Sequence, residues 1–171
     1  VDASAAGTTI TKAEIVDSYD LGVKYQSANF IFSGAIFTYE YSDYQQSYTD
    51  QETMQSITVT VGDSTMSGIE GMATYNYSDT LTFTASLGFL DAEFADNTSD
   101  GSPFQYGGNK FRLAPEVSGA ININKVVHFD NWTMDVNWLT SFQSEVFFES
   151  SNYPGMSQDT YSLTDFSLKL N

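Results

Sequence analysis

Leu81-Thr82-Phe83-Thr84-Ala85-Ser86-Leu87-Gly88-Phe89 is the stretch that decides the fold class, because apolar and polar residues alternate along it without a break. A period of two places the apolar residues on one face of a β-strand and the polar residues on the other. The same alternation recurs at residues 19–25, 69–75, 117–124, 132–138 and 162–170, and residues 30–41 are apolar on both faces. No stretch has a convincing helical period. The sequence therefore predicts an all-β fold of about seven strands.

The lengths of the connections between these strands predict how they are arranged. Short connections at residues 26–29, 78–80 and 126–131 alternate with long polar ones at 44–65, 97–114 and 149–160. Short turns at one end and long loops at the other are typical of an outer-membrane barrel. We therefore predict an antiparallel up-and-down meander that forms part of a transmembrane β-barrel.

Composition and charge narrow the classes of function. The chain has 171 residues, 22 acidic against six basic ones, a net charge of −16 and no cysteine. Such a charge excludes nucleic acid as a partner, which would need a basic patch. The missing cysteines exclude disulfide scaffolds and thiol catalysis. No run of 18 apolar residues is present, so strands of a barrel are the one route by which this chain could span a bilayer.

The two faces of the predicted strands should meet different solvents. The expected convex, lipid-facing residues are Leu81, Phe83, Leu87, Phe89, Ile121, Ile123, Met134, Val136 and Trp138. The expected concave residues are Thr82, Thr84, Asn122, Asn124 and Asp135. Aromatic residues at strand ends, such as Tyr41, Tyr44, Tyr75 and Tyr77, fit an interfacial girdle. Ordinary β-propensity would also enrich them.

Several segments, taken in order, resemble one known family. They are Tyr19-Asp20-Leu21-Gly22-Val23-Lys24, Ala35-Ile36-Phe37-Thr38-Tyr39-Glu40-Tyr41, Ser67-Gly68-Ile69-Glu70-Gly71, Leu113-Ala114-Pro115-Glu116 and Gln158-Asp159-Thr160-Tyr161-Ser162-Leu163. The ordered set is similar to the barrel of TonB-dependent outer-membrane receptors. That resemblance implies uptake of a scarce nutrient across the bacterial outer membrane, foremost a ferric siderophore or similar iron complex.

The resemblance also implies partners that this sequence does not display. Family members have a plug domain, a segment that engages TonB, and 22 strands. Seven strands cannot close a single-chain barrel, which has an even number of strands, and an open array leaves two unpaired edges. We therefore expect residues 1–171 to be a segment from the C-terminal half of a receptor barrel, without the plug or the closing strands. The expected partners are outer-membrane lipid, the rest of the barrel and plug, TonB, and an extracellular small-molecule ligand.

Two other interpretations remain open at this point. One is a secreted β-sandwich that binds carbohydrate by stacking sugars on aromatic rings. The other is a small eight-stranded outer-membrane barrel in which residues 53–62 supply the eighth strand. A sandwich would bury its apolar faces between two sheets, whereas a barrel would turn them toward lipid.

The residue pattern predicts ligand binding rather than catalysis. His128 is the one histidine, and no Gly-x-Ser-x-Gly elbow surrounds any serine. An acidic segment at residues 91–101 departs from a calcium loop at Thr98 and Gly107, so we expect a solvated loop there. We predict no enzyme activity, no cofactor and no metal site. The candidate ligand-binding residues lie in the long loops: Tyr44, Gln45, Tyr48, Phe104, Tyr106, Phe147 and Tyr153.

Overall fold

The computed structural model describes residues 12–49, 54–96 and 106–171, and every regular element among them is a β-strand. Within these ranges no helix is long and apolar enough to cross a membrane. Seven strands form one sheet: β1 (Ile15–Gln26), β2 (Phe30–Thr49), β3 (Ser56–Ser78), β4 (Leu81–Phe94), β5 (Val117–His128), β6 (Thr133–Gln143) and β9 (Tyr161–Leu170). A second sheet pairs the two-residue strands β7 (Val146–Phe147) and β8 (Ser157–Gln158).

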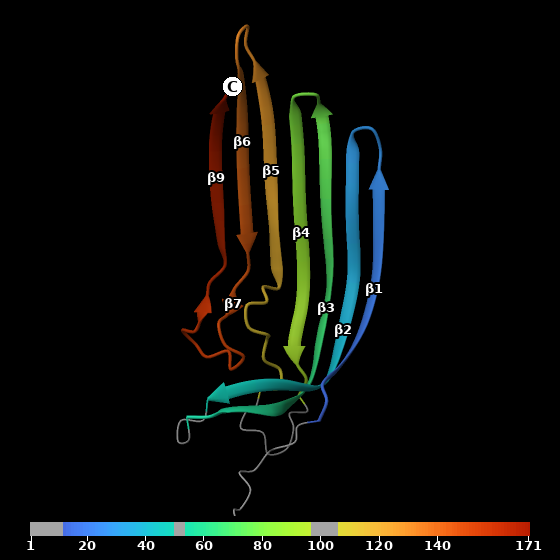
Figure 1. Cartoon of the computed structure of the whole chain (residues 1–171), viewed down its shortest axis with the longest axis vertical. Coiled ribbons are helices and arrows are strands. Elements are labelled where there is room, and N and C mark those ends of the chain that lie inside the picture. The colour runs from blue at the N-terminus through green and yellow to red at the C-terminus, as the bar shows by residue number, and fades with distance from the viewer. Residues whose placement is uncertain (1–11, 50–53, 97–105) are drawn as a thin grey trace, which may run out of the picture.

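The sheet is an antiparallel meander, as predicted. Its spatial order is β1-β2-β3-β4-β5-β6-β9, so each strand lies beside its neighbour in sequence, apart from the small β7–β8 hairpin. Figure 1 shows the short turns at the top and the long connections at the bottom. The described parts of the three long connections therefore emerge at one end of the sheet, as expected for a barrel wall. Residues 97–105 of the second connection lie outside the described residues.

The register confirms which of the predicted residues share a face of the sheet. Phe83 lies opposite Ile123, which lies opposite Trp138, so these three side chains share one face. That apolar face is the more exposed one: Leu87 is 43% and Ile121 is 52% exposed. The polar residues of β4 alternate with them and are half-buried on the concave face. The sheet thus turns its apolar side outward, which is the reverse of a water-soluble protein.

The hairpin formed by β2 and β3 corrects the predicted boundaries. Residues 44–65 were expected to form a loop, but β2 runs on to Thr49 and β3 begins at Ser56, with Ser47 Oγ and Thr58 Oγ1 only 2.7 Å apart across the ladder. The β-branched residues Ile57, Val59 and Val61 explain the strand, since they favour extended backbone. The prediction of a separate eighth strand at residues 53–62 is also wrong, because residues 56–62 belong to β3, which runs on to Ser78; residue 53 lies outside the described residues.

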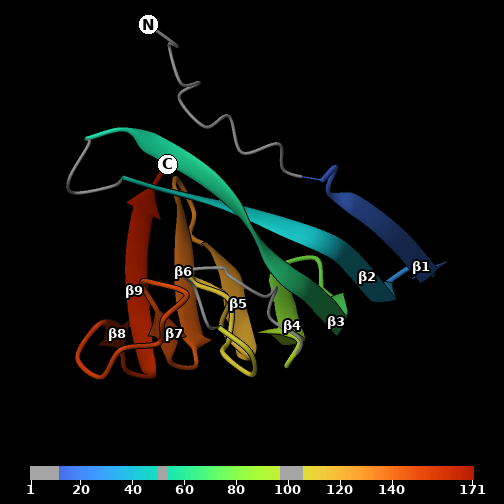
Figure 2. The ribbon, with the colours of Figure 1, turned by 90° about the horizontal axis from the view of Figure 1, so that it is seen from below.

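A bend in this hairpin carries its end across the loop side of the sheet. The register shifts between Tyr41 and Gln45, where Asp43 has φ of 54° and Gly62 has φ of 141°. A backbone conformation with positive φ costs a glycine little, and the bulge turns both strands together. Figure 1 shows the bent hairpin at the loop end, and Figure 2 shows it crossing from the body of β2 and β3 toward the side where β9 lies.

The core of the molecule lies at this loop end rather than within the sheet. The buried apolar residues are Val61, Ala92, Phe94 and Val146. No second sheet covers the convex face of β1 to β9 in the described part of the chain, so the sandwich interpretation is wrong. The sheet is open as well: among the strands that the structure describes, β1 pairs with β2 alone and β9 with β6 alone.

Candidate ligand-facing surface at the loop end

Strand β4 changes its buried face where it approaches the loop end. Up to Phe89 its apolar side chains point to the exposed convex face. Beyond that residue the apolar ones are Leu90, Ala92 and Phe94, on the opposite parity, and Ala92 and Phe94 are each only 3% exposed. Because side chains alternate in direction along a strand, this switch turns the apolar residues inward, toward the bent hairpin.

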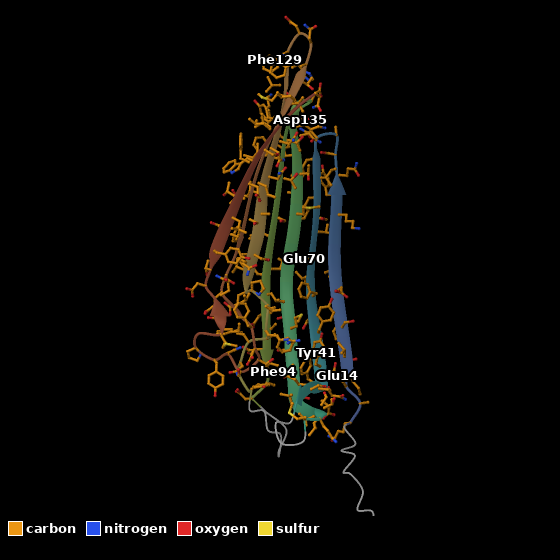
Figure 3. All side chains as sticks on the ribbon, turned by 60° about the vertical axis from the view of Figure 1, so that its left-hand side comes forward. Glu14, Tyr41, Glu70, Phe94, Phe129 and Asp135 are labelled. Atoms are coloured by element: carbon orange, nitrogen blue, oxygen red, sulfur yellow. The ribbon has the colours of Figure 1, made fainter. Side chains whose placement is uncertain are left out.

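Five aromatic rings from three segments, Phe94 among them, gather at the loop end. Tyr41 and Tyr44 come from β2 at the bend, and Tyr106 and Phe111 come from the β4–β5 connection. The ring centroids of Phe94 lie 5.6 Å from Tyr44, 5.5 Å from Tyr106 and 4.6 Å from Phe111. Tyr41 and Tyr44 lie 5.7 Å apart at 83°, an edge-to-face arrangement. We call Tyr41, Tyr44, Phe94, Tyr106 and Phe111 the aromatic cluster; Figure 3 labels two of its members.

The cluster corrects the girdle interpretation for two residues. Tyr41 and Tyr44 pack against protein rings at the loop end instead of standing at a lipid rim. Tyr75 and Tyr77, at the short-turn end, have ring centroids 6.4 Å apart, and Tyr77 is 67% exposed. That exposure suits an interfacial position.

Charged groups surround the aromatic cluster. Burial raises the pKa of the Tyr44 phenol, the carboxylate of Glu14 raises it further, and the guanidinium of Arg112 opposes both. Burial also raises the pKa of Tyr106, with a smaller contribution from Glu149. Both phenols are therefore neutral hydrogen-bonding groups at physiological pH. Arg112, the one arginine of the sequence, supplies a cation at this surface.

Lys110 ties the β4–β5 connection to the sheet through three carboxylates. Its Nζ lies 2.7 Å from Asp91, 3.3 Å from Glu93 and 3.2 Å from Glu116. The hydrogen bond to Asp91 is the main cause that raises the pKa of Lys110, although partial burial opposes it. An ion-pair network of this kind contributes more to stability than a single exposed ion pair does. It fixes Phe111, the next residue, beside Phe94.

The structure brings only some of the predicted site residues together. Tyr44 and Tyr106 both contact Phe94. The Gln45 backbone N–H donates to Glu14 Oε2 at 2.8 Å, and its side-chain Nε2 donates to the Lys12 carbonyl at 2.6 Å. Phe147 lies in β7 and Tyr153, 65% exposed, lies in the following turn. The Tyr48 side chain and all of Phe104 lie outside the described part of the structure.

Sequence reasoning missed Phe94, Phe111 and Arg112. The signal for Phe94 was present, since Leu90, Ala92 and Phe94 switch parity and Asp91 and Glu93 replace the outward apolar residues. No comparable pattern surrounds Phe111, because its position depends on the Lys110 network in space. Among the described residues, no group of three or more histidine, aspartate or glutamate side chains is placed to hold a metal ion.

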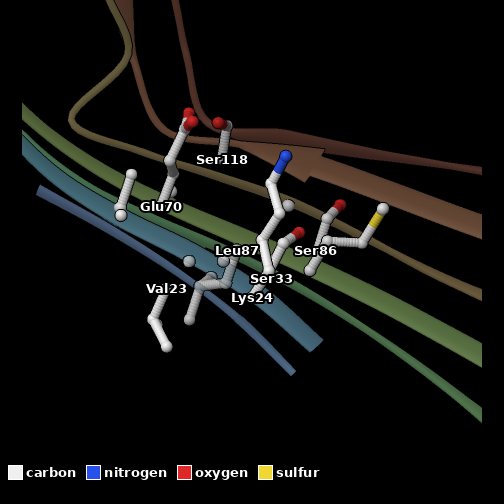
Figure 4. A pocket seen from close by; sticks show the side chains of 14 residues that line it. Val23, Lys24, Ser33, Glu70, Ser86, Leu87 and Ser118 are labelled. Atoms are coloured by element: carbon white, nitrogen blue, oxygen red, sulfur yellow. The ribbon is translucent and has the colours of Figure 1, made fainter. Parts of the chain in front are cut away.

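The concave face carries a second, polar surface. A hollow of about 650 Å³ is lined by Lys24, Glu70, serines and other small residues of β1 to β5, together with Val23, Met72 and Leu87. Figure 4 shows Lys24 and Glu70 on one side of the sheet, together with Ser118, while Val23 points to the other side. A wall that is polar inside and apolar outside matches the two solvents that a large membrane barrel separates.

The fold and these surfaces define the wall of a transmembrane β-barrel with a capped loop end. The chain belongs to the family described as "TonB dependent receptor-like, beta-barrel", which it matches over residues 2–171. This family consists of receptors and transporters of the outer membrane, not of enzymes. A comparison with curated proteins found no match.

Solved structures of siderophore receptors share the fold at low identity. The ferric yersiniabactin uptake receptor FyuA from Yersinia pestis is 20% identical, with a TM-score of 0.76 over 91% of this chain and 22% of its own. The ferric preacinetobactin receptor BauA from Acinetobacter baumannii is 16% identical, with a TM-score of 0.69 over 91% and 22%. The siderophore receptor PiuA from the same species is 17% identical, with a TM-score of 0.65 over 88% and 21%. The chain thus spans about a fifth of the length of these receptors.

Proposed function

We propose that this chain is part of an outer-membrane receptor for TonB-dependent uptake, and that the ligand is a ferric siderophore or a similar iron complex. The observation that carries the ligand class is the aromatic cluster with Arg112 beside it. Aromatic rings offer flat apolar contact, and a guanidinium offers charge and hydrogen bonds to an anionic chelate. The siderophores named for two of the structurally similar receptors support this choice.

The two sheet edges support the proposed partners. A backbone N–H or C=O group that lacks a hydrogen-bond partner in a bilayer costs several kcal/mol, about as much as an unpaired polar group buried inside a protein. The outer edges of β1 and β9 would each leave such a row of groups in lipid. We propose that further barrel strands pair with both edges, that a plug fills the barrel, and that TonB acts through the N-terminal part of the receptor. Lipid covers the convex face.

We retain all seven residues that the sequence proposed for the ligand site, and we rank them by their position at the loop end. Tyr44 and Tyr106 lie in the aromatic cluster and are the first choice for ligand contact. Gln45, Tyr48, Phe147 and Tyr153 lie on neighbouring parts of the same end, and Phe104 precedes Tyr106 by two residues. We propose that all seven residues line the ligand site.

Uptake by the full-length receptor in its own outer membrane tests this function. The assay follows iron-55 delivered as ferric yersiniabactin, ferric preacinetobactin or ferric citrate, with and without the coupling protein TonB. Tyr44→Ala should weaken binding of the accepted complex by about tenfold, equal to about 1.4 kcal/mol, while Tyr44→Phe retains the ring and most of the affinity. Tyr77→Ala, at the short-turn end, is the matched control. Uptake of none of these complexes, or uptake independent of TonB, would contradict the proposal.

A further inference from the structure

The side chain of Asn152 makes two hydrogen bonds between two loop-end connections that are distant in sequence. The first connection links β4 to β5 and carries Lys110 and Phe111. The second links β6 to β9 and carries β7 and β8. The backbone N–H of Lys110 donates to Asn152 Oδ1 at 2.7 Å, and Asn152 Nδ2 donates to the Lys110 carbonyl at 3.0 Å. One amide side chain thus satisfies both backbone groups of a residue 42 positions away.

The local backbone at Asn152 presents the side chain for this role. Asn152 has φ of 48°, in the left-handed region that asparagine tolerates better than most residues. Its N–H donates to the Glu149 carbonyl at 3.1 Å, and its Nδ2 donates to the same carbonyl at 3.2 Å. The side-chain amide is therefore held by its own turn. It pairs with the Lys110 N–H and carbonyl in the way that the backbone of a neighbouring strand would. Asn152 is only half-buried, yet all three polar functions of its side chain are engaged.

Two neighbouring contacts bring the same connections together without extending the amide pairing. Asn109 Nδ2 donates to the Ser150 carbonyl at 2.9 Å, and the Leu113 N–H donates to the Phe147 carbonyl at 2.8 Å. On its other side, Lys110 forms a bridge to Glu93 of β4 and ion pairs with the carboxylates described above. Lys110 thus lies between the sheet and Asn152, and Phe111 follows it into the aromatic cluster.

We propose that Asn152 is a positioning residue that joins the β4–β5 and β6–β9 connections into one unit beneath the ligand-facing surface. By holding the Lys110 backbone it fixes Phe111, and with it the floor of the aromatic cluster. Tyr153, the next residue, is carried on the same turn, so ligand contact with either connection bears on both. This role in ligand capture rests on the proposed function, whereas the joining of the two connections does not.

Hydrogen exchange at single amides of the full-length, ligand-free receptor tests the joining. Asn152→Gly tolerates the same φ and removes only the side chain, so the Lys110 amide should exchange about tenfold faster, the usual effect of one lost hydrogen bond. Asn152→Asp keeps an acceptor for that N–H but loses both donated bonds, so the Lys110 amide should stay protected. The Val126 amide, which donates to the Thr80 carbonyl at 2.8 Å at the short-turn end, is the internal reference. Asn131→Gly, in the opposite turn, is the control variant.

The outcomes separate positioning from general stability. Faster exchange at Lys110 with unchanged exchange at Val126 in Asn152→Gly supports the proposal. Unchanged exchange at Lys110, or equal acceleration at both amides, would overturn it.

Binding of ferric yersiniabactin or ferric preacinetobactin to the same variants tests the functional consequence. If the receptor accepts either complex, Asn152→Gly should raise its dissociation rate about tenfold while thermal unfolding of the barrel stays unchanged. An unaltered dissociation rate would overturn the role in ligand capture. A receptor that binds neither complex would count against the proposed function, and the exchange measurement would still decide whether Asn152 joins the connections.

Discussion

Strand β4 contains two regions that share a backbone ladder but bury opposite faces. In the wall region, up to Phe89, the apolar side chains point outward and stay exposed on the convex face. In the cap region, beyond Phe89, Ala92 and Phe94 point inward and are buried, while Asp91 and Glu93 take the outward positions. The two regions are adjacent in sequence and obey the same alternation, so the surrounding solvent, not the strand, decides which face is apolar.

The difference shows where each region obtains its stability. The wall gains little from packing within this chain and depends on lipid against its convex face. The cap is a small protein core, stabilised by burial and by ring contacts. A charged residue stands at each end of the apolar face of the wall. At the loop end, Asp91 is the next residue after Phe89 on that face. At the short-turn end, Lys125 lies opposite Leu81 and donates to Thr80 Oγ1 at 2.8 Å.

The largest effect is expected from removal of the central ring of the cap. Phe94→Ala should destabilise the cap by about 3–5 kcal/mol, the usual cost of emptying a buried aromatic site. Hydrogen exchange of the bilayer-embedded receptor measures it at two amides: Ala95, which donates to Asp63, and Gly108, which donates to Phe94. Phe89→Ala, five residues earlier and 47% exposed on the wall, should leave these amides unchanged. Equal acceleration in both variants would show that wall and cap open as one unit.

The wall could be predicted from the sequence because its information is local. Alternation along Leu81–Phe94 and its neighbours fixes the strands, and a slip of one residue would reverse every side chain, which pins the register. Connection lengths then fix the meander. Only the position of the strand ends failed, at β2 and β3, where polar residues in 44–65 resembled a loop.

The cap could not be predicted in the same way, because it depends on contacts between distant segments. The bend at Asp43 and Gly62 brings Tyr44 to Phe94, and no residue pattern near Tyr44 predicts this contact. Likewise Phe111 reaches the cluster through Lys110, whose partners come from β4 and from the residue before β5. Of the predicted ligand-binding residues, Tyr44 and Tyr106 were chosen for their chemistry and their loop positions, and the fold supplied the neighbour they share.

An arginine placed on each face of the wall tests the facing directly. Leu87→Arg should destabilise membrane insertion by about 2–4 kcal/mol if the site lies near the bilayer midplane. Thr84→Arg should cost less, since its side chain points to the concave, polar face beside Asn122. A membrane-folding titration of the full-length barrel gives both values. A penalty at Thr84 equal to that at Leu87 would contradict the assignment of lipid to the convex face.

A smaller effect is expected where charge anchors the cap to the wall. Lys110→Met leaves Asp91, Glu93 and Glu116 without their shared cation and should destabilise the β4–β5 connection by about 1 kcal/mol, because the network is partly exposed. Exchange of the Phe111 amide at low and high salt measures the loss, which added salt should reduce. Lys12→Met removes a pair 3.5 Å long with a side chain 79% exposed, and should have almost no effect. A similar loss in both variants would assign the effect to general charge.

The smallest effect concerns the proton on Lys110, and its sign follows from the same network. The hydrogen bond to Asp91, with those to Glu116 and Glu93, raises the pKa of Lys110 above its ordinary value of 10.5. A cation with a raised pKa contributes its full stability below the unfolded value and loses it only as the pH rises through the folded value. Loss of the Lys110 proton should therefore leave the anchor intact up to about pH 10.5 and weaken it only in stronger alkali. Acylation of the amine, followed by mass spectrometry across alkaline pH, measures this, since only the neutral amine reacts. Asp91→Asn should move the labelling curve of Lys110 to lower pH, and by more than Glu93→Gln does, because the Asp91 contact is 2.7 Å and the Glu93 contact 3.3 Å. A curve that neither substitution moves would show that the three carboxylates do not hold the proton, and that packing and backbone hydrogen bonds such as that from Phe111 to Ala92 join the cap to the wall.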